Sequence, residues 1–203
     1  ARYHEINKGL WARFEKGEVR KEKLQTQRFA ALLEALGRQG NPAQMNDYYL
    51  GQLAQNGQIL PGADEFLRDV EDYVTIGIIT NGMQKAQAGR LAASGIGEFA
   101  DGIFISEKLG VAKPDKRFVN IAMDKLGITD HSRVLVIGDS ISADICCGQA
   151  AGLDTCWFNF KDLAQDAAGN QPTYTVRGFE ELKTVILEQE ELDHVGEKKR
   201  HSV

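Results

Sequence analysis

After residue 60 the sequence alternates between short apolar runs and segments with apolar residues at helical spacing, and this alternation constrains the fold more than any other feature. The predicted strands are 73–80, 102–106, 133–138, 155–160 and 173–176, and the predicted helices are 84–93, 116–126, 142–151 and 178–190. Strands that are apolar on both faces are typical of a parallel sheet covered by helices. Because crossovers between parallel strands are right-handed, we predict an α/β fold with a doubly wound, mostly parallel sheet.

The first 60 residues contain no strand-like run, and their apolar residues fall at helical spacing instead. Gly17 and Gly37 interrupt this pattern, and the Gly-Asn-Pro sequence at 40–42 indicates a turn before another helix. Residues 190–203 are too polar to pack against the rest of the chain. The predicted division of the chain is a small helical cap over 1–60, an α/β core over 61–189 and a polar tail over 190–203.

Composition excludes several classes of protein. A formal net charge of −5 argues against general affinity for nucleic acid. No apolar run approaches the roughly 20 residues that span a bilayer. Cys146, Cys147 and Cys156 have neither metal-ligand spacing nor the pattern of a disulfide framework, which indicates small buried residues in a reducing compartment. We therefore expect a cytoplasmic monomer or homodimer that binds neither nucleic acid nor a membrane.

Polar side chains follow three of the predicted strands, at the edge where open parallel sheets bind ligands. At the first, Thr80, Asn81 and Gly82 offer a hydroxyl, an amide and a turn into a helix whose first N–H groups are suited to an anion. The alternative is a plain turn with a helix cap. At the second, Pro114 favours an extended Lys113, whose ammonium would neutralise a phosphate unless it is simply a solvated surface lysine.

The third strand end carries two carboxylates, Asp139 and Asp144. Like charges this close raise each other's pKa, and a bound divalent cation removes that repulsion. Hard oxygen ligands suit Mg²⁺. The alternative is that Asp144 only complements a helix N-terminus while Asp139 caps a loop. A hydroxyl, an ammonium and an acidic metal site at three strand ends together indicate a phosphoryl group bound with Mg²⁺.

The order of ITNG at 79–82, KPD at 113–115 and GDSISAD at 138–144 resembles motifs two, three and four of the haloacid dehalogenase superfamily. Residues 1–60 look like its type-one cap, and LPGADEFL and SRVLVIGDSISADI resemble its pyrimidine 5′-nucleotidases. The resemblance implies a Mg²⁺-dependent phosphatase that hydrolyses nucleoside monophosphates through an aspartyl-phosphate. The roles that it implies are phosphoryl binding by Thr80, Asn81, Gly82 and Lys113, direct Mg²⁺ binding by Asp139, and support of the metal's water shell or its neighbours by Asp144.

One motif of the family does not occur in this sequence. The first motif, DxDxT, carries the nucleophilic aspartate and an acid/base aspartate, whereas Asp69, Asp72 and Asp101 have a different spacing and context. In the family this motif ends a central strand, which lies between the strands that end here at Thr80 and Gly138. Covalent catalysis needs that carboxylate. We therefore expect the sequence to be an N-terminally truncated record of a longer phosphatase, inactive as written.

Several alternatives stay open at this point. The substrate could be a sugar phosphate or phosphoglycolate, because only the cap separates such phosphatases. A haloacid dehalogenase would need no metal, and a chain without a nucleophile could be a non-catalytic binding module. Trp11, Phe14 and Phe29 could face a nucleobase, but their helical spacing favours packing in the core.

Overall fold

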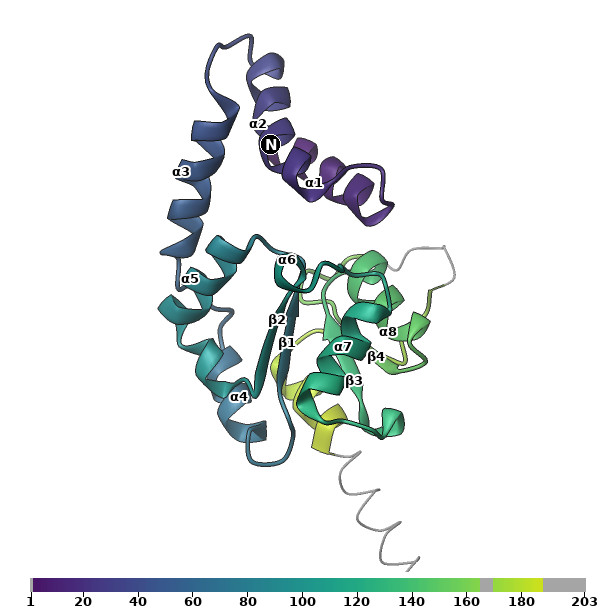
Figure 1. The fold of residues 1–203 in the computed structure, drawn as a ribbon. Helices are drawn as coiled ribbons and strands as arrows, with labels where there is room; N and C mark the ends of the chain where they lie inside the picture. Colours follow the sequence, from purple (N-terminus) through teal and green to yellow (C-terminus); the bar gives the residue numbers. More distant parts are fainter. Residues whose placement is uncertain (1, 165–169, 188–203) are drawn as a thin grey trace, which may run out of the picture. The chain divides into compact units, whose positions relative to one another are not determined.

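The computed structural model describes residues 2–164 and 170–187 (Figure 1). The chain forms two compact units. The first unit consists of Ala1–Gln58, Ile79–Glu98 and Ile103–Lys113, and the second of Ile59–Ile78, Phe99–Gly102 and Pro114–Val203. The predicted boundaries of cap and core stay predictions, and the predicted polar tail lies outside the described residues.

The first unit is mainly helical. Its helices are α1 (Arg2–Glu15), α2 (Lys21–Ala35), α3 (Pro42–Ala54), α5 (Gln84–Ser94) and α6 (Ser106–Leu109). The predicted turn before α3 is confirmed, because the Asn41 side chain accepts hydrogen bonds from the backbone N–H groups of Ala43 and Gln44 at 3.0 and 3.2 Å. Pro42 occupies the first turn, where a missing N–H costs nothing. Helices α1 and α2 end before Gly17 and Gly37, as the sequence predicts.

A cluster of buried apolar side chains connects α1, α2 and α3 with the start of α5. Its members are Leu10, Val19, Leu24, Leu50, Met83 and Ala86. Trp11 and Phe14 pack against this cluster, with their ring centroids 5.5 Å apart in a T-shaped pair. Phe29 is buried and stacks on Tyr3 at 5.6 Å. The prediction that these three aromatic side chains pack within the helical segment is therefore confirmed.

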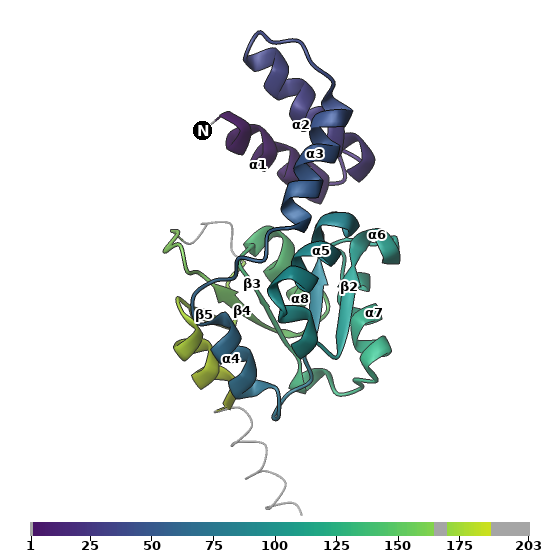
Figure 2. The same ribbon diagram turned by 90° about the vertical axis from the view of Figure 1, so that its left-hand side faces the viewer.

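The second unit contains a parallel three-stranded sheet. Its strands are β3 (Leu135–Gly138), β4 (Asp154–Phe158) and β5 (Tyr174–Val176), in the order β3–β4–β5. The helical elements are α4 (Ala63–Val70), α7 (Arg117–Leu126), a 3-10 turn (His131–Arg133), a π-helical turn (Ile141–Ile145), α8 (Cys146–Ala150) and residues 179–187 (Figure 2). The predicted helix over 142–151 thus begins as a π-helical turn.

Aromatic packing holds α4 and the helix at 179–187 on this sheet. Phe179 lies 4.8 Å from Phe158 of β4 and 5.3 Å from Phe66 of α4, measured between ring centroids. Cys156, Val176 and Leu182 complete the buried cluster. Such packing needs an apolar face on each element, and the sheet and both helices supply one.

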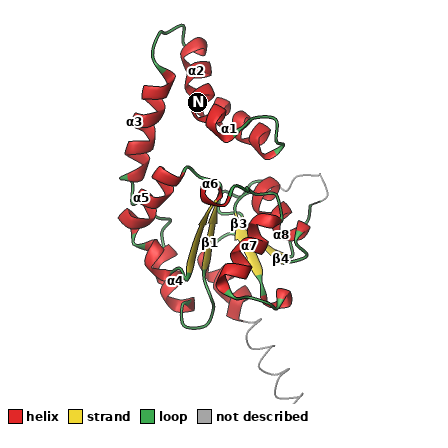
Figure 3. Cartoon of the chain, viewed as in Figure 1, coloured by secondary structure: helices red, strands yellow, loops and turns green. Residues whose placement is uncertain are grey.

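Strands β1 (Gly77–Thr80) and β2 (Gly102–Ile105) pair with each other, and a 3-10 turn (Ile96–Phe99) precedes β2 (Figure 3). The predicted strand over 73–80 is too long at its start. The Tyr73 N–H donates to the carbonyl of Val70 at 3.0 Å, which closes the end of α4, and Tyr73 itself is 63% exposed. Residues 73 and 74 therefore belong to a turn and a bend, and β1 begins only at Gly77.

The α/β fold class with parallel strands is confirmed, and the described strands form two sheets, β1–β2 and β3–β4–β5. The strands that end at Thr80 and Gly138 are consequently not ladder partners within the described residues. Direct pairing of these two strands would have contradicted the hypothesis of an absent strand, which stays a prediction.

The prediction of buried cysteines is confirmed for two of the three residues. The cysteines form no disulfide among the described residues; Cys147 and Cys156 are buried, and Cys146 is half-buried. Burial raises the pKa of the Cys156 thiol to about 11, so this side chain is a packing residue and not a reactive thiol. Among the helices of the described residues, none has the length and apolar character to cross a bilayer.

Candidate functional site

Thr80 ends β1 with its hydroxyl oxygen held as an acceptor. The Gly82 N–H donates to Thr80 Oγ1 at 3.0 Å, and the Gln87 side-chain amide donates to the same oxygen at 2.8 Å. A hydroxyl has two lone pairs and one proton, so this pattern leaves the Thr80 O–H to act as a donor. Sequence reasoning missed Gln87, because its contact exists only once α5 packs back on the strand end.

The turn at Gly82 has no room for a side chain. A Cβ atom there would lie 2.1 Å from Gln87 Nε2 and 2.5 Å from Gln87 Cγ. The amide of Gln87 would have to move, and its hydrogen bond to Thr80 would break. A glycine at this position is thus a condition for the arrangement of the Thr80 hydroxyl.

Gly82→Ala is expected to lower the free energy of unfolding by about 1–2 kcal/mol, since it removes one hydrogen bond and adds a close contact. The measurement is urea denaturation followed by circular dichroism. Gly51→Ala is the matched control, because a Cβ at Gly51 within α3 meets nothing within 4 Å. The control should be neutral or stabilising by up to about 1 kcal/mol. Equal effects of the two substitutions would contradict the steric argument.

Asn81 and Lys113 clamp two loops together through a pair of hydrogen bonds. Asn81 Nδ2 donates to the Lys113 carbonyl at 2.8 Å, and the Lys113 N–H donates to Asn81 Oδ1 at 2.9 Å. The Lys113 ammonium donates to the carbonyl of Ile79 at 3.0 Å, beside Thr80 in the chain. Lys113 is only 8% exposed, so the alternative of a solvated surface lysine is wrong. The structure thus joins Asn81 to Lys113 and places the Lys113 ammonium at the carbonyl that precedes Thr80, while the role of these residues in binding an anion stays a prediction.

The expectation that the first N–H groups of α5 are open to an anion needs a correction. The N–H of Gln84, the first residue of α5, donates to Glu107 Oε2 at 2.7 Å. A carboxylate of the protein therefore occupies this part of the helix N-terminus, where the helix dipole favours negative charge. Any anion held at Thr80 depends on side chains more than on that N–H group.

Lys21, the first residue of α2, belongs to the same cluster and was missed from the sequence. It is 8% exposed, and its ammonium donates to Ser106 Oγ at 2.7 Å and to the Gly82 carbonyl at 2.9 Å. Glu107 Oε1 lies 3.7 Å from the same ammonium. Burial lowers the pKa of Lys21, and the Glu107 carboxylate opposes this shift. No local pattern marks this lysine among the charged residues that surround it.

In the second unit, Asp144 lies against the end of β3. Its Oδ2 accepts the N–H of Ser140 at 3.0 Å, and the residue is 7% exposed. A Cβ atom on Gly138 would fall 2.2 Å from the same carboxylate oxygen. Asp144 therefore stabilises the start of the π-helical turn, in line with the alternative that it complements a helix N-terminus. The same hydrogen bond holds its carboxylate at the carboxyl end of β3.

Asp139 is the more open of the two carboxylates, with its side chain 59% exposed. The Trp157 indole N–H donates to the Asp139 carbonyl at 3.1 Å, and Lys161 Nζ lies 3.7 Å from Asp139 Oδ2. The described residues contain no group of three or more His, Cys, Asp or Glu side chains that could hold a metal. Mg²⁺ usually needs only one or two protein carboxylates besides water and phosphate, so this donor set suits Mg²⁺.

The predicted site residues fall in both units. Thr80, Asn81, Gly82 and Lys113 belong to the first, and Asp139 and Asp144 to the second. Each group is assembled within its own unit by the contacts given above. The convergence of the two groups on one ligand stays a prediction.

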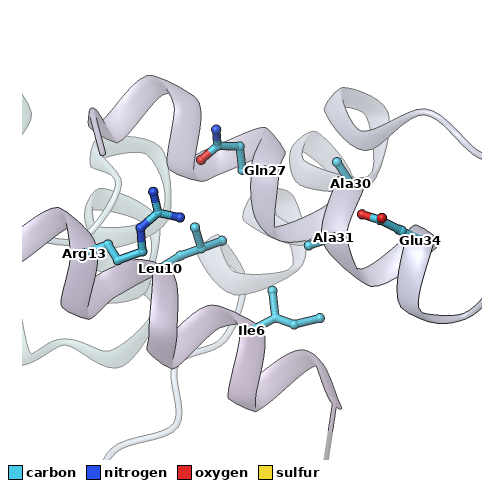
Figure 4. A pocket seen from close by; sticks show the side chains of 7 residues that line it. All are labelled: Ile6, Leu10, Arg13, Gln27, Ala30, Ala31 and Glu34. Carbon is cyan, nitrogen blue, oxygen red and sulfur yellow. The ribbon is translucent and has the colours of Figure 1, made fainter. Parts of the chain in front are cut away.

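A separate hollow of about 310 Å³ lies between α1 and α2 (Figure 4). Its lining residues are Ile6, Leu10, Arg13, Gln27, Ala30, Ala31 and Glu34. Arg13 and Glu34 stand at opposite ends of a mostly aliphatic floor. None of the predicted site residues contributes to this hollow.

Comparisons with known proteins agree with the motif order. A model of the haloacid dehalogenase-like hydrolases matches residues 2–152. The pyrimidine 5′-nucleotidase YjjG of Escherichia coli is 37% identical over 184 residues, which cover 91% of this chain and 80% of that protein. The pyrimidine 5′-nucleotidase PynA of Streptococcus pneumoniae is 36% identical over 185 residues, which cover 89% of this chain and 76% of that protein.

A similar solved structure is that of YfnB from Bacillus subtilis, named as a HAD-hydrolase and crystallised with magnesium. The TM-score is 0.85 at 36% sequence identity, and the match covers 91% of this chain and 80% of that chain. Because the match covers 91% of the chain, the likeness extends over both compact units.

Proposed function

Because this chain belongs to the haloacid dehalogenase-like hydrolase family, we propose that it forms part of a Mg²⁺-dependent phosphatase for small phosphomonoesters, chiefly pyrimidine nucleoside 5′-monophosphates. The observation that carries the proposal is the buried Lys113, whose backbone is held by Asn81 and whose ammonium donates to the Ile79 carbonyl beside Thr80. The choice of substrate rests on two relatives named as pyrimidine 5′-nucleotidases, at 36–37% identity.

Thr80, Lys113 and Asn81 of the first unit each have a separate role in this proposal. The Thr80 O–H donates to a phosphoryl oxygen, since its lone pairs are engaged by Gly82 and Gln87. The Lys113 ammonium offsets the charge that develops on the phosphoryl oxygens, in a place where burial strengthens the interaction. Asn81 holds the backbone of Lys113, so that little reorganisation is needed when the phosphoryl group binds.

Asp139 and Asp144 are the residues that would hold the metal. When bound, Mg²⁺ supplies positive charge that orients and neutralises phosphoryl oxygens. Asp144 is already oriented by the Ser140 N–H, and Asp139 is exposed enough to exchange its ion pair with Lys161 for another cation. Support for this assignment comes from the carboxylate chemistry and from the magnesium in the YfnB crystal.

The proposed reaction also needs a nucleophilic carboxylate and an acid/base carboxylate, and the printed sequence contains no DxDxT motif. The nucleophile attacks phosphorus, the P–O bond to the nucleoside breaks, and the acid delivers a proton to the leaving oxygen. Water then attacks the acyl-phosphate and releases inorganic phosphate. In the proposal, a strand that precedes residue 1 supplies both carboxylates.

The test compares the printed chain with a version extended by its natural upstream codons. Both are assayed for phosphate release from pyrimidine and purine nucleoside monophosphates, a sugar phosphate and phosphoglycolate, with Mg²⁺ or with EDTA. We expect the extended protein to release phosphate preferentially from pyrimidine nucleotides and to lose this activity in EDTA. The printed chain should release no phosphate.

Each other outcome changes a named part of the proposal. Preference for a sugar phosphate or phosphoglycolate would replace the substrate class. Release of halide from a 2-haloacid, retained in EDTA, would indicate a dehalogenase. Turnover by the printed chain would contradict the need for an upstream nucleophile. Phosphate binding without turnover by either protein would indicate a non-catalytic binding protein.

A further inference from the structure

One buried cation of the first unit has no part in the proposed chemistry. Lys21 begins α2, yet its ammonium contacts residues 61 and 85 positions further along the chain, Gly82 and Ser106. Burying a lysine is costly unless hydrogen bonds and an opposite charge compensate. Both are present here, since two acceptors lie within 2.9 Å and the Glu107 carboxylate lies at 3.7 Å. The arrangement is a built contact and not a chance encounter on the surface.

We propose that Lys21 is a positioning residue, which fixes the Asn81–Gly82 turn of the anion site and couples this turn to the first turn of helix α2. The inference deepens the proposed function and rests on it. It assigns no contact with the substrate to Lys21, whose hydrogen bonds go to the protein.

Both peptide groups that flank the Gly82 Cα atom are held by side chains. The Gly82 N–H donates to Thr80 Oγ1 at 3.0 Å, and the Gly82 carbonyl accepts from Lys21 at 2.9 Å. If Lys21 is removed, the carbonyl loses this donor, and the Gly82 backbone can rotate, which also moves the adjoining peptide group whose N–H bonds the Thr80 hydroxyl. Loss of Lys21 would then weaken the binding of an anion through the changed orientation of the Thr80 hydroxyl, without any contact between Lys21 and the anion.

The two buried lysines hold opposite ends of the same segment. Lys113 donates to the carbonyl of Ile79, before Thr80, and Lys21 donates to the carbonyl of Gly82, after Asn81. Both residues are 8% exposed. The four-residue segment 79–82 is thus anchored by one ammonium at each end, so loss of either should loosen the hydroxyl and amide between them.

Glu107 extends the same network to α5. Its Oε1 faces Lys21 at 3.7 Å, while its Oε2 accepts the N–H of Gln84 at 2.7 Å. The carboxylate therefore compensates the charge of Lys21 and holds the start of α5. Because α2, the turn and α5 share this network, an anion that orders the turn should also order α2, and the coupling must be reciprocal.

The experiment measures the binding of inorganic phosphate to the 203-residue chain by calorimetry, in three variants. Lys21→Met removes the charge and its donors, and we expect it to weaken binding about tenfold, as loss of a buried charged hydrogen bond implies. Lys21→Arg keeps charge and donors and should stay within about threefold of the parent chain. Lys23→Met is the matched control, an exposed lysine on the same helix, and should change nothing.

A second readout follows amide hydrogen exchange in the first turn of α2. Phosphate should slow exchange there in the parent chain and in Lys21→Arg, but not in Lys21→Met. A residue that merely stabilised the fold would not create this dependence on phosphate. Phosphate binding without any slowing in the parent chain would contradict the coupling.

The pH profile is a third readout. The charged groups that face Lys21 are Glu107 from α6 and its neighbour Glu22, which raise its pKa, while burial lowers it by more. The ammonium is therefore lost at a lower pH than for an ordinary lysine. Phosphate affinity of the parent chain should therefore fall at a lower pH than that of Lys21→Arg, whose guanidinium stays charged. Coincident profiles would contradict the role of the Lys21 charge.

The outcomes separate this inference from the proposed function. If the parent chain binds no phosphate, the proposed anion site fails. If the parent chain and Lys21→Met bind phosphate equally, only the inference about Lys21 fails. Should Lys21→Met not fold, Ser106→Ala removes one acceptor and leaves the ammonium in place. A loss of about threefold in phosphate affinity would support the inference, and unchanged affinity would overturn it.

Discussion

Lys113→Met is expected to weaken the binding of inorganic phosphate to this chain by at least about 30-fold, because truncating a buried, hydrogen-bonded charge typically costs about 2–5 kcal/mol. Methionine keeps the length of the side chain but removes its charge and donors. The clamp from Asn81 uses only the backbone of Lys113, so it survives the substitution. Isothermal titration with phosphate measures the effect.

The fold should largely withstand this change. Lys113→Met leaves the Ile79 carbonyl without the ammonium donor, a loss of about 1–3 kcal/mol, while the removal of a buried charge is itself often favourable. Lys108→Met is the control, an exposed lysine on α6 in the same unit. Phosphate affinity within threefold of the parent chain in Lys113→Met would remove this lysine from the proposed site.

Asp139→Asn is expected to remove Mg²⁺ binding by the chain, with little change in stability. The amide is a weaker ligand for a hard cation, and the second carboxylate alone offers too little charge. The side chain is 59% exposed and its ion pair with Lys161 is exposed as well, so the free energy of unfolding should change by less than about 1 kcal/mol. Calorimetric titration with MgCl₂ and urea denaturation together test both parts.

Two further variants make this prediction sharper. Asp124→Asn, an exposed aspartate on α7, should leave Mg²⁺ binding unchanged. Gly138→Ala should also weaken Mg²⁺ binding, by a different route, because a Cβ would meet Asp144 Oδ2 at 2.2 Å and displace a buried carboxylate. That variant should lose about 1–3 kcal/mol of stability. Unchanged Mg²⁺ affinity in Asp139→Asn would contradict its assigned role.

The errors of the sequence prediction have local causes. The aromatic and β-branched residues at 73–76 predict a continuation of the strand, but α4 closes with a turn that uses the Tyr73 N–H. Lys113 could be either a buried or a solvated lysine, because proline restricts only its backbone and not the direction of its side chain. The turn that closes α4 decides the conformation at Tyr73, whereas burial, a property of the packed chain, decides the state of Lys113.

What the sequence by itself determined is local. Apolar periodicity predicted most helices and strands, and Asn41 and Pro42 marked the start of α3. The positions of Thr80, Lys113 and Asp139 after predicted strands marked them as candidate site residues. These signals are readable because each depends on neighbours within a few positions. Only the tertiary structure decided that Asn81 clamps Lys113, that Gln87 and Gly82 orient Thr80, and that Lys21 reaches them from the first helical segment. Such contacts join residues up to 85 positions apart, and no local pattern encodes them, because they arise from how helices and strands pack.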